Sequence, residues 1–205
     1  MYKLNQNEYE SIVFLTKCVY YSDLVYPTLL GYQHSVVLLS GLRMNLFIGK
    51  DFDLIVICGT NQVRDWITNL KVGLGITPRQ YQQALSRIMQ HYSTMDKNKT
   101  LIISGHSLGF GIAEYCASFM SDDVLAIGFN GCPVNHLCTN KDSGNIINII
   151  SEHDILNNLC SILPGKCYMK HLGDVITLPD KYRLPCIKSH CDFETFMKYR
   201  IEKEV

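Results

Sequence analysis

The stretch "LIISGHSLGFG", residues 101–111, decides the fold because it joins a run of apolar β-formers directly to a helical segment. Its serine, Ser107, lies between Gly105 and Gly109 in a GxSxG pattern. A chain that turns from strand to helix this tightly strains the turn residue, and small neighbours let the backbones approach each other. We therefore predict that the Ser107 hydroxyl stands exposed at the carboxyl end of a strand, beside a helix N-terminus.

The whole chain has the size and composition of one globular domain. It has 205 residues, 47% of them hydrophobic, and its 19 basic residues balance 19 acidic ones. A net charge of zero without a basic cluster gives no electrostatic basis for binding nucleic acid. The first ten residues are polar, and no apolar run approaches the roughly 18–20 residues that span a bilayer. We expect a single soluble, cytoplasmic domain over residues 1–205.

The nine cysteines are expected to be reduced thiols. No CxxC pair occurs, and several cysteines lie in apolar runs, as Cys58 does in "LIVICGT". The late cysteines have histidines nearby, but their spacing matches no known ligand pattern; they are Cys160, Cys167, Cys186 and Cys191. No metal site is therefore expected.

Strand and helix patterns alternate along the chain. Periodicity predicts helices over 8–22, 79–92, 108–121 and 192–204. It predicts strands over 34–41, on both sides of a Gly-Lys-Asp turn within 44–60, and over 100–104, 123–130, 145–154 and, more weakly, 171–179. Such alternation indicates an α/β fold with a mostly parallel central sheet and helices on both faces.

A serine hydroxyl needs a base and an acid that orients the base, and in hydrolases of this kind the acid and then the histidine follow the serine. Asp154 is the best acid because it ends an apolar run, with Glu152 as the alternative. His190 is the best base because it directly precedes the last helix, in a loop that can reach back. His171 is the alternative base, although its place at the start of a weak strand suits a structural residue.

The oxyanion formed during acyl transfer needs two donors. The amide of Leu108 is one candidate, since it begins the helix after the serine. Thr60 is the other, because it lies in the loop "VICGTNQVRDW" that follows an earlier strand. The segment after this loop predicts a short cover that is apolar beneath and charged above, with a core helix as the alternative; its apolar residues are Val63, Trp66, Ile67 and Leu70.

Several linked motifs resemble those of the class 3 lipases, the fungal triacylglycerol lipase family and its phospholipase relatives. They are "VICGTNQVRDWITNL", "IISGHSLGFGIAEYCA", "AIGFNGCPV", "IISEHDILNNL" and "HLGDVITL", in the family's order. The resemblance implies an α/β-hydrolase fold with Ser107 as nucleophile, Asp154 as acid and His190 as base. It also implies that Thr60 and Leu108 donate to the oxyanion, and that the segment 63–70 is a lid that opens at a lipid interface.

Three departures from the family pattern bear on these expectations. Cys58 replaces an arginine, which predicts the loss of a structural ion pair. Phe110 replaces a second glycine, which predicts either a narrower pocket or tighter packing at the turn. The chain is also shorter than secreted members, which favours a shorter-chain ester or a single-acyl lipid.

The resulting expectation is a serine hydrolase of lipid esters, of acylglycerols or phospholipids, that acts through an acyl-enzyme without a metal or organic cofactor. Any contact with a membrane or lipid droplet would be peripheral, near Trp66. Two alternatives stay open. Acyl transfer or thioester hydrolysis would use the same three residues, and a non-catalytic binding module could retain the fold without the chemistry.

Overall fold

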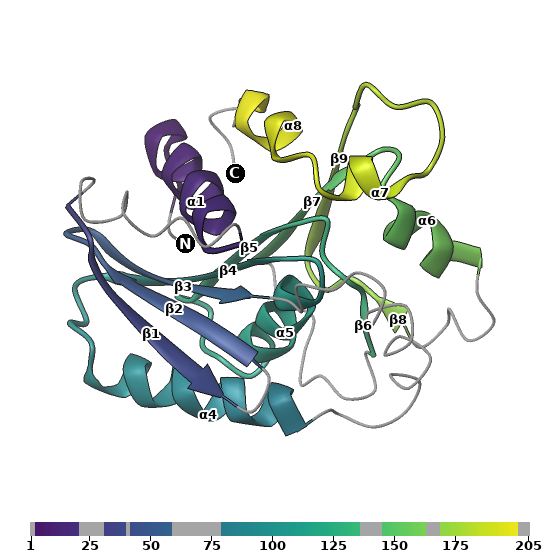
Figure 1. Cartoon of the computed structure of the whole chain (residues 1–205). Helices are drawn as coiled ribbons and strands as arrows, with labels where there is room; N and C mark the ends of the chain where they lie inside the picture. Colours follow the sequence, from purple (N-terminus) through teal and green to yellow (C-terminus); the bar gives the residue numbers. More distant parts are fainter. Residues whose placement is uncertain are drawn as a thin grey trace.

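A computed structural model describes residues 3–20, 31–39, 42–58, 79–135, 145–162 and 169–200. Seven strands form its central sheet, in the order β1-β2-β3-β4-β5-β7-β9 (Figure 1). Their bounds are β1 Gln33–Leu39, β2 Leu42–Ile48, β3 Phe52–Cys58, β4 Thr100–His106, β5 Leu125–Phe129, β7 Ile146–Ser151 and β9 Asp174–Leu178. A separate two-stranded ladder pairs β6, Val134–Asn135, with β8, Met169–Lys170.

β2 runs opposite to the other six strands of the sheet. β1, β2 and β3 are antiparallel neighbours, and every pairing from β3 to β9 is parallel. The predicted turn between β2 and β3 is confirmed: the Gly49 amide donates to Phe52 O over 3.1 Å. A Cβ on Gly49 would lie 2.7 Å from that same oxygen, so the turn needs glycine there.

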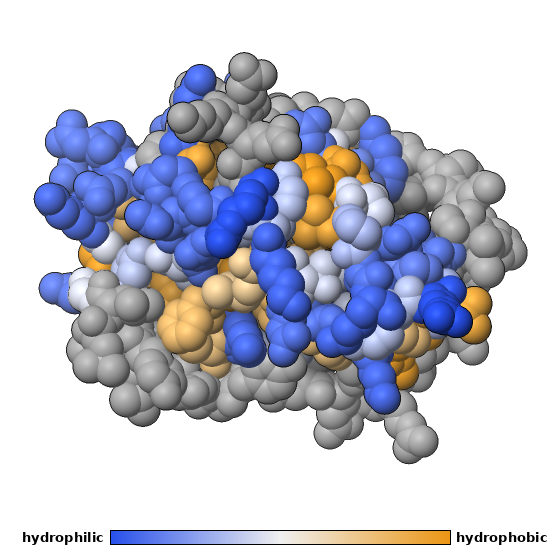
Figure 2. Space-filling model, turned by 90° about the horizontal axis from the view of Figure 1, so that it is seen from above, coloured by the Kyte–Doolittle hydropathy of each residue, from blue (hydrophilic) through white to orange (hydrophobic). Residues whose placement is uncertain are grey.

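Helices cover the sheet on both faces, as predicted (Figure 1). α1 and α8 lie above it, and α4 and α5 lie below it. The helices are α1 Gln6–Tyr20, α4 Arg79–Thr94, α5 Leu108–Ala117, α6 Ile155–Ile162, α7 Ile187–His190 and α8 Phe193–Lys198. Seen from above (Figure 2), the described surface is mostly hydrophilic, and its apolar side chains come in small groups.

Alternate residues of the central strands pack into two separate hydrophobic cores, one on each face of the sheet. In β3, all seven residues are buried; Leu54 and Val56 pack on the side of α1 and α8, whereas Ile55 and Ile57 pack on the side of α4 and α5. A strand buried on both faces reads as a continuous apolar run, which is why "FDLIVIC" was recognisable in the sequence. The predicted α/β class with a mostly parallel sheet is confirmed.

The last helix is shorter than predicted. Its expected span was 192–204, but α8 ends at Lys198 and Tyr199 is extended, with φ −68° and ψ 138°. Contacts with α1 explain the end, because Gln6 Nε2 donates to Tyr199 O over 3.2 Å and the Tyr9 and Tyr199 rings meet edge to face at 5.8 Å. None of the described helices is long and apolar enough to cross a membrane.

Candidate active site

Ser107 occupies a strained turn between β4 and α5. Its φ is 59° and its ψ is −131°, a backbone conformation that costs a non-glycine residue about 1–3 kcal/mol. A Cβ on Gly105 would lie 2.6 Å from the carbonyl carbon of Gly109, so the approach of strand to helix excludes any side chain at Gly105. The strain predicted for Ser107 and the steric role predicted for Gly105 are confirmed.

The backbone of Ser107 is held by four hydrogen bonds. Its carbonyl oxygen accepts from the amides of Phe110, Gly111 and Cys132 over 3.1, 3.2 and 3.1 Å. Its own amide donates to Phe129 O over 3.2 Å. These bonds connect the turn to the first turn of α5 and to the end of β5, so the positive φ is imposed by its surroundings.

The structure tests the expectations for Ser107 and Leu108, whereas those for the second oxyanion donor and the cover fall outside the described residues. The prediction that Ser107 stands exposed is wrong: 4% of its surface is exposed, because the first turn of α5 and the chain at the end of β5 pack against the turn. Leu108 is the first residue of α5, where an N–H has no intrahelical acceptor and the helix dipole is positive. The second expected oxyanion donor and the expected cover lie outside the described residues; these are Thr60, Val63, Trp66, Ile67 and Leu70.

Phe110 packs into the core at the turn. It is fully buried, and its ring occupies the space above two glycines. A Cβ on Gly128 would fall 1.9 Å from two ring carbons, and one on Gly131 would fall 2.3 Å from the ring. Of the two effects expected from a phenylalanine at position 110, a narrower pocket or tighter packing at the turn, the structure shows tighter packing.

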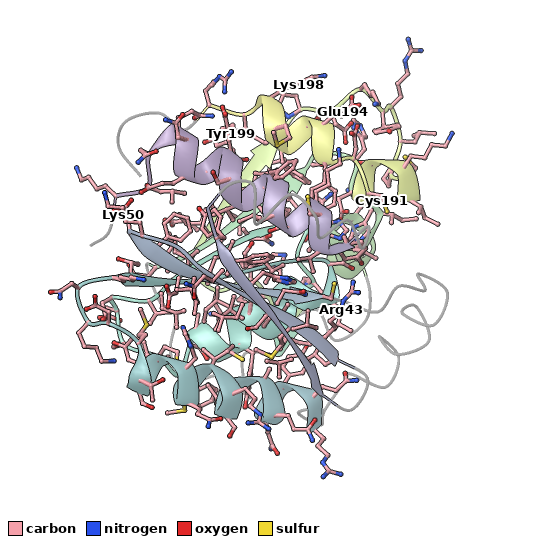
Figure 3. All side chains as sticks on the ribbon, turned by 60° about the vertical axis from the view of Figure 1, so that its left-hand side comes forward. Arg43, Lys50, Cys191, Glu194, Lys198 and Tyr199 are labelled. Atoms are coloured by element: carbon pink, nitrogen blue, oxygen red, sulfur yellow. The ribbon has the colours of Figure 1, made fainter. Side chains whose placement is uncertain are left out.

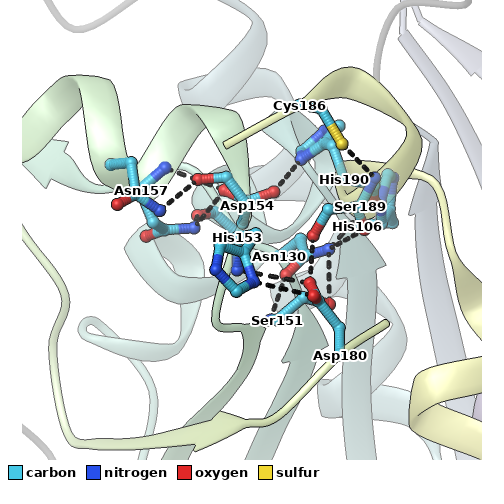
Figure 4. Close-up of polar contacts among 12 residues, drawn as sticks. His106, Asn130, Ser151, His153, Asp154, Asn157, Asp180, Cys186, Ser189 and His190 are labelled. Carbon is cyan, nitrogen blue, oxygen red and sulfur yellow. Dashed lines mark hydrogen bonds and ion pairs between the residues drawn. The ribbon is translucent and has the colours of Figure 1, made fainter. Parts of the chain in front are cut away.

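Asp154 and His190 are brought together. Asp154 is completely buried and lies three residues beyond the end of β7, just before α6. Its Oδ2 accepts from His190 Nδ1 over 2.5 Å (Figure 4). Its Oδ1 accepts from the backbone amide and from the Nδ2 of Asn157, both over 2.8 Å. The carboxylate thus caps α6 with one oxygen and holds the imidazole with the other.

The segment that carries His190 is also held by side chains from three other parts of the chain. His190, 3% exposed, ends the short helix α7, and its carbonyl oxygen accepts from Asn130 Nδ2 over 3.0 Å and from His106 Nε2 over 2.6 Å. Ser189 donates its hydroxyl to Asp180 Oδ2 over 2.5 Å (Figure 4). The imidazole is consequently presented from a rigid backbone.

His106 links the serine to this segment. Because a carbonyl only accepts, the Nε2 that contacts His190 O carries the proton, and the buried Nδ1 has no hydrogen-bond partner. Burial, together with the nearby His190, lowers the pKa of His106 to about 3 and keeps the ring neutral. The two rings lie 4.6 Å apart between centroids. Since Ser107 follows His106 directly, the serine lies at the same edge as the Asp154–His190 pair.

The alternative acid and base occupy other positions. Glu152 is exposed and its amide donates to Leu178 O over 2.8 Å. His171 Nε2 lies 2.6 Å from Asn157 Oδ1, and its Nδ1 lies 3.4 Å from Glu114 Oε2. Neither residue takes the place of Asp154 or His190 in the pair described above.

Asn130, Asp180 and His106 support the site but were not singled out from the sequence. Asn130 has a φ of 45°, and its Oδ1 accepts from the Ser151 amide over 2.7 Å. An asparagine before glycine at the end of an apolar strand favours the left-handed conformation, so "FNG" carried a usable signal. Asp180 carried none, because its partner Ser189 lies nine residues further on, in the short helix α7.

Cys58 has an arginine beside it after all, supplied by the neighbouring strand. Arg43 pairs with Cys58 in the β2–β3 register, and its Nη2 lies 3.2 Å from the sulfur and 2.6 Å from Val19 O. Arg43 is the second residue of β2 and is labelled in Figure 3. Burial raises the pKa of the Cys58 thiol, and Arg43 opposes that rise. The contact is a hydrogen bond to a neutral thiol in place of an ion pair.

Six described cysteines are in the thiol form, outside any disulfide: Cys18, Cys58, Cys116, Cys132, Cys186 and Cys191. Within the described ranges, no three or more histidine, cysteine or acidic side chains are grouped so that they could hold a metal ion.

Comparison with known proteins places this geometry in a family context. The profile of the Tle-like phospholipase domain matches residues 36–145. An extracellular phospholipase A1 of Serratia liquefaciens is 28% identical over 102 residues, which are 50% of this chain and 31% of that protein. The chain therefore spans about a third of the length of this relative.

Solved lipase structures share the fold. Lipase II from Rhizopus niveus superposes with a TM-score of 0.62 and 14% identity, over 90% of this chain and 85% of that one. MDLA from Penicillium cyclopium gives 0.61 and 12%, over 89% and 83%. At these identities the likeness concerns the arrangement of strands and helices, which is that of an α/β-hydrolase.

Proposed function

The chain belongs to the Tle-like phospholipase domain family, and we propose that it hydrolyses the carboxylic esters of lipids with Ser107 as nucleophile. The observation that carries the proposal is the 2.5 Å contact between His190 Nδ1 and the buried Asp154 carboxylate, at the sheet edge where β4 leads into Ser107 at positive φ. A serine, a histidine and a carboxylate in this arrangement perform acyl transfer in unrelated folds.

In the proposed mechanism, Asp154 accepts a hydrogen bond from the Nδ1–H of His190, so the proton stays on Nδ1 and Nε2 is left as the base. Nε2 takes the proton of Ser107 as its oxygen attacks the acyl carbon. The tetrahedral oxyanion is stabilised by the amide of Leu108 and by Thr60, and loss of one such donor typically costs about 10²–10³ in turnover. His190 then returns the proton to the leaving alcohol, and water releases the acyl group by the same base.

We propose a phospholipid as the substrate class, with hydrolysis at a carboxylic ester. The family description and the name of the Serratia relative both support a phospholipase. Contact with the lipid surface would be peripheral, near Trp66. Leu184 is 75% exposed and Ile187 is 47% exposed, and both lie close in sequence to His190, so they are described apolar side chains suited to such contact. The cytoplasmic location stays a prediction.

The experiment compares the wild-type chain with Ser107→Ala on p-nitrophenyl esters from acetate to palmitate and on phosphatidylcholine vesicles. We expect the wild type to release fatty acid and lysophospholipid, and Ser107→Ala to lose this activity while staying folded. The preferred chain length measures the acyl site. A folded wild type that cleaves no ester contradicts the proposal and favours a binding module. Acyl release that requires an added alcohol, or occurs with thioesters alone, favours the acyltransferase or thioesterase alternative.

A further inference from the structure

A second polar cluster lies behind Asp154, on the side away from His190. It consists of Glu114 in α5, Asn148 in β7, Asn157 in α6 and His171 after β8. Glu114 and Asn148 are completely buried, and the His171 side chain is 10% exposed. The mechanism proposed above uses none of these residues, yet buried polar groups that form a connected network usually specify one arrangement of their neighbours.

The peptide units of Gly131 orient both amides of this cluster. The Gly131 amide donates to Asn148 Oδ1 over 3.1 Å, so Asn148 presents its Nδ2 to His171. The Gly131 carbonyl accepts from Asn157 Nδ2 over 3.3 Å, so Asn157 presents its Oδ1 to His171. Each side chain therefore has one assignment of oxygen and nitrogen.

These assignments determine the tautomer of His171. Asn157 Oδ1 can only accept, so His171 Nε2, 2.6 Å away, carries a proton. Asn148 Nδ2 donates, and it lies 3.0 Å from Nδ1 and 3.2 Å from Nε2, so the unprotonated Nδ1 of the neutral ring accepts. The same Nδ1 lies 3.4 Å from Glu114 Oε2.

The consequence reaches Asp154 through Asn157. With its oxygen bound to His171, Asn157 must direct its Nδ2 to Asp154 Oδ1, which also accepts the Asn157 amide, each over 2.8 Å (Figure 4). These two bonds fix the rotation of the carboxylate and leave Oδ2 for His190. If the donor on His171 were removed, Asn157 Oδ1 would lose this hydrogen bond, and the side chain would be held less firmly, through the bonds from Nδ2 to Gly131 O and Asp154 Oδ1.

We propose that His171 and Asn157 are positioning residues: His171 Nε2–H holds the Asn157 amide so that Asn157 keeps Asp154 aimed at His190. The inference rests on the proposed function for its catalytic consequence. In this arrangement His171, the alternative base of the sequence analysis, acts on Asp154 indirectly, through Asn157. It also explains why Asn157, in "SEHDILNN", follows the acid by three residues, where its amide and side chain reach the same oxygen.

Turnover of a soluble p-nitrophenyl ester provides the first test. We expect Asn157→Leu and His171→Leu to lower kcat by about 10- to 100-fold with KM nearly unchanged. The acidic limb of the pH–rate profile should move to higher pH in Asn157→Leu, because a carboxylate with fewer other donors stabilises the His190 imidazolium better. His171→Gln retains an N–H for Asn157 and should recover most of the lost kcat.

Asn158→Leu is the matched control. It removes the same amide from the same helix, but that amide donates to the backbone oxygens of Glu152 and Asp154. We expect its kcat and pH profile to match the wild type. An active wild type whose kcat and pH profile are unaffected by Asn157→Leu and His171→Leu overturns the positioning role and leaves the proposed function standing.

Proton NMR tests the same idea without turnover, so it also applies if the chain cleaves no ester. In protein labelled with ¹⁵N-histidine, the Nδ1–H of His190 bound to Asp154 should give a far-downfield resonance. We expect this resonance to be the same in the wild type, His171→Gln and Asn158→Leu, and to shift or broaden in Asn157→Leu and His171→Leu. An identical resonance in all five folded proteins overturns the inference.

Discussion

Phe110 and Gly128 offer the most quantitative test of how the turn at Ser107 is packed. In Gly128→Ala the new methyl carbon would lie 1.9 Å from two ring carbons of Phe110. Carbon atoms in contact are about 3.5 Å apart, so the ring would have to move by about 1.6 Å in a core where it has no exposed surface. Overpacking of this kind costs typically about 1–3 kcal/mol. We expect about 3 kcal/mol for Gly128→Ala because both contacts involve a rigid ring.

The same substitution should have the opposite sign once the ring is gone. Phe110→Ala alone should cost about 3–5 kcal/mol through lost burial and the cavity left behind. In that background the Gly128→Ala methyl enters the vacated space, and alanine also restricts the unfolded chain, so we expect a gain of up to about 1 kcal/mol. The coupling between the two positions should then be about 3–4 kcal/mol.

Urea denaturation of the wild type, the two single variants and the double variant measures this coupling. Equal m-values across the four proteins would show that only stability has changed. If Phe110→Ala is too unstable to measure, Phe110→Leu provides the same comparison with a smaller change. A cost of Gly128→Ala that is the same with and without the ring would refute the reasoning, because something other than Phe110 would then require glycine.

Three further predictions concern the site. Ser107→Gly should raise the free energy of unfolding by about 1 kcal/mol, because glycine adopts a φ of 59° freely. Ser107→Ala keeps the strain and should not raise it. Equal stabilities of these two variants in urea would contradict the prediction. The free energy of unfolding should fall as the pH drops below 6.5, because His106 binds a proton in the unfolded chain. In the folded protein the buried ring, with a pKa of about 3, stays neutral. His106→Gln should flatten this fall by up to about 1.4 kcal/mol per pH unit between about pH 5.5 and 3.5; parallel curves would count against it. Asp180→Asn should weaken the bond from Ser189 and lower both melting temperature and His190-dependent turnover; loss of neither would show that α7 is held by other contacts.

The fold was predictable because its determining patterns are local. "FDLIVIC" and "LIISGHSLGFG" signal a buried strand and a strand–turn–helix unit within a few residues. Ser107 could be recognised for the same reason, since Gly105 and Gly109 beside it indicate the close approach of two backbones. The short elements α6 and α7 were not predicted, because helices of eight and four residues are too short for a helical repeat to stand out in the sequence.

The contacts around the candidate site were harder to foresee because they join distant parts of the chain. Chain order and the position before a helix pointed to Asp154 and His190, but nothing in the sequence predicts that Asn130 donates to His190 O across 60 residues. The same holds for Arg43: the family pattern predicted the loss of an ion pair at Cys58, but not that an arginine of the adjacent strand would contact the thiol. Such partners depend on strand register, which periodicity alone does not define.

The most direct test of the central claim is the stoichiometry and location of fluorophosphonate labelling. A serine activated by a histidine and a carboxylate attacks this reagent, whereas an ordinary buried serine does not. We expect intact-mass spectrometry of the wild type to show one adduct per chain, peptide mapping to assign it to Ser107, and Ser107→Ala and His190→Ala to show none. A folded wild type that gains no adduct, or gains it on another residue, would contradict the account.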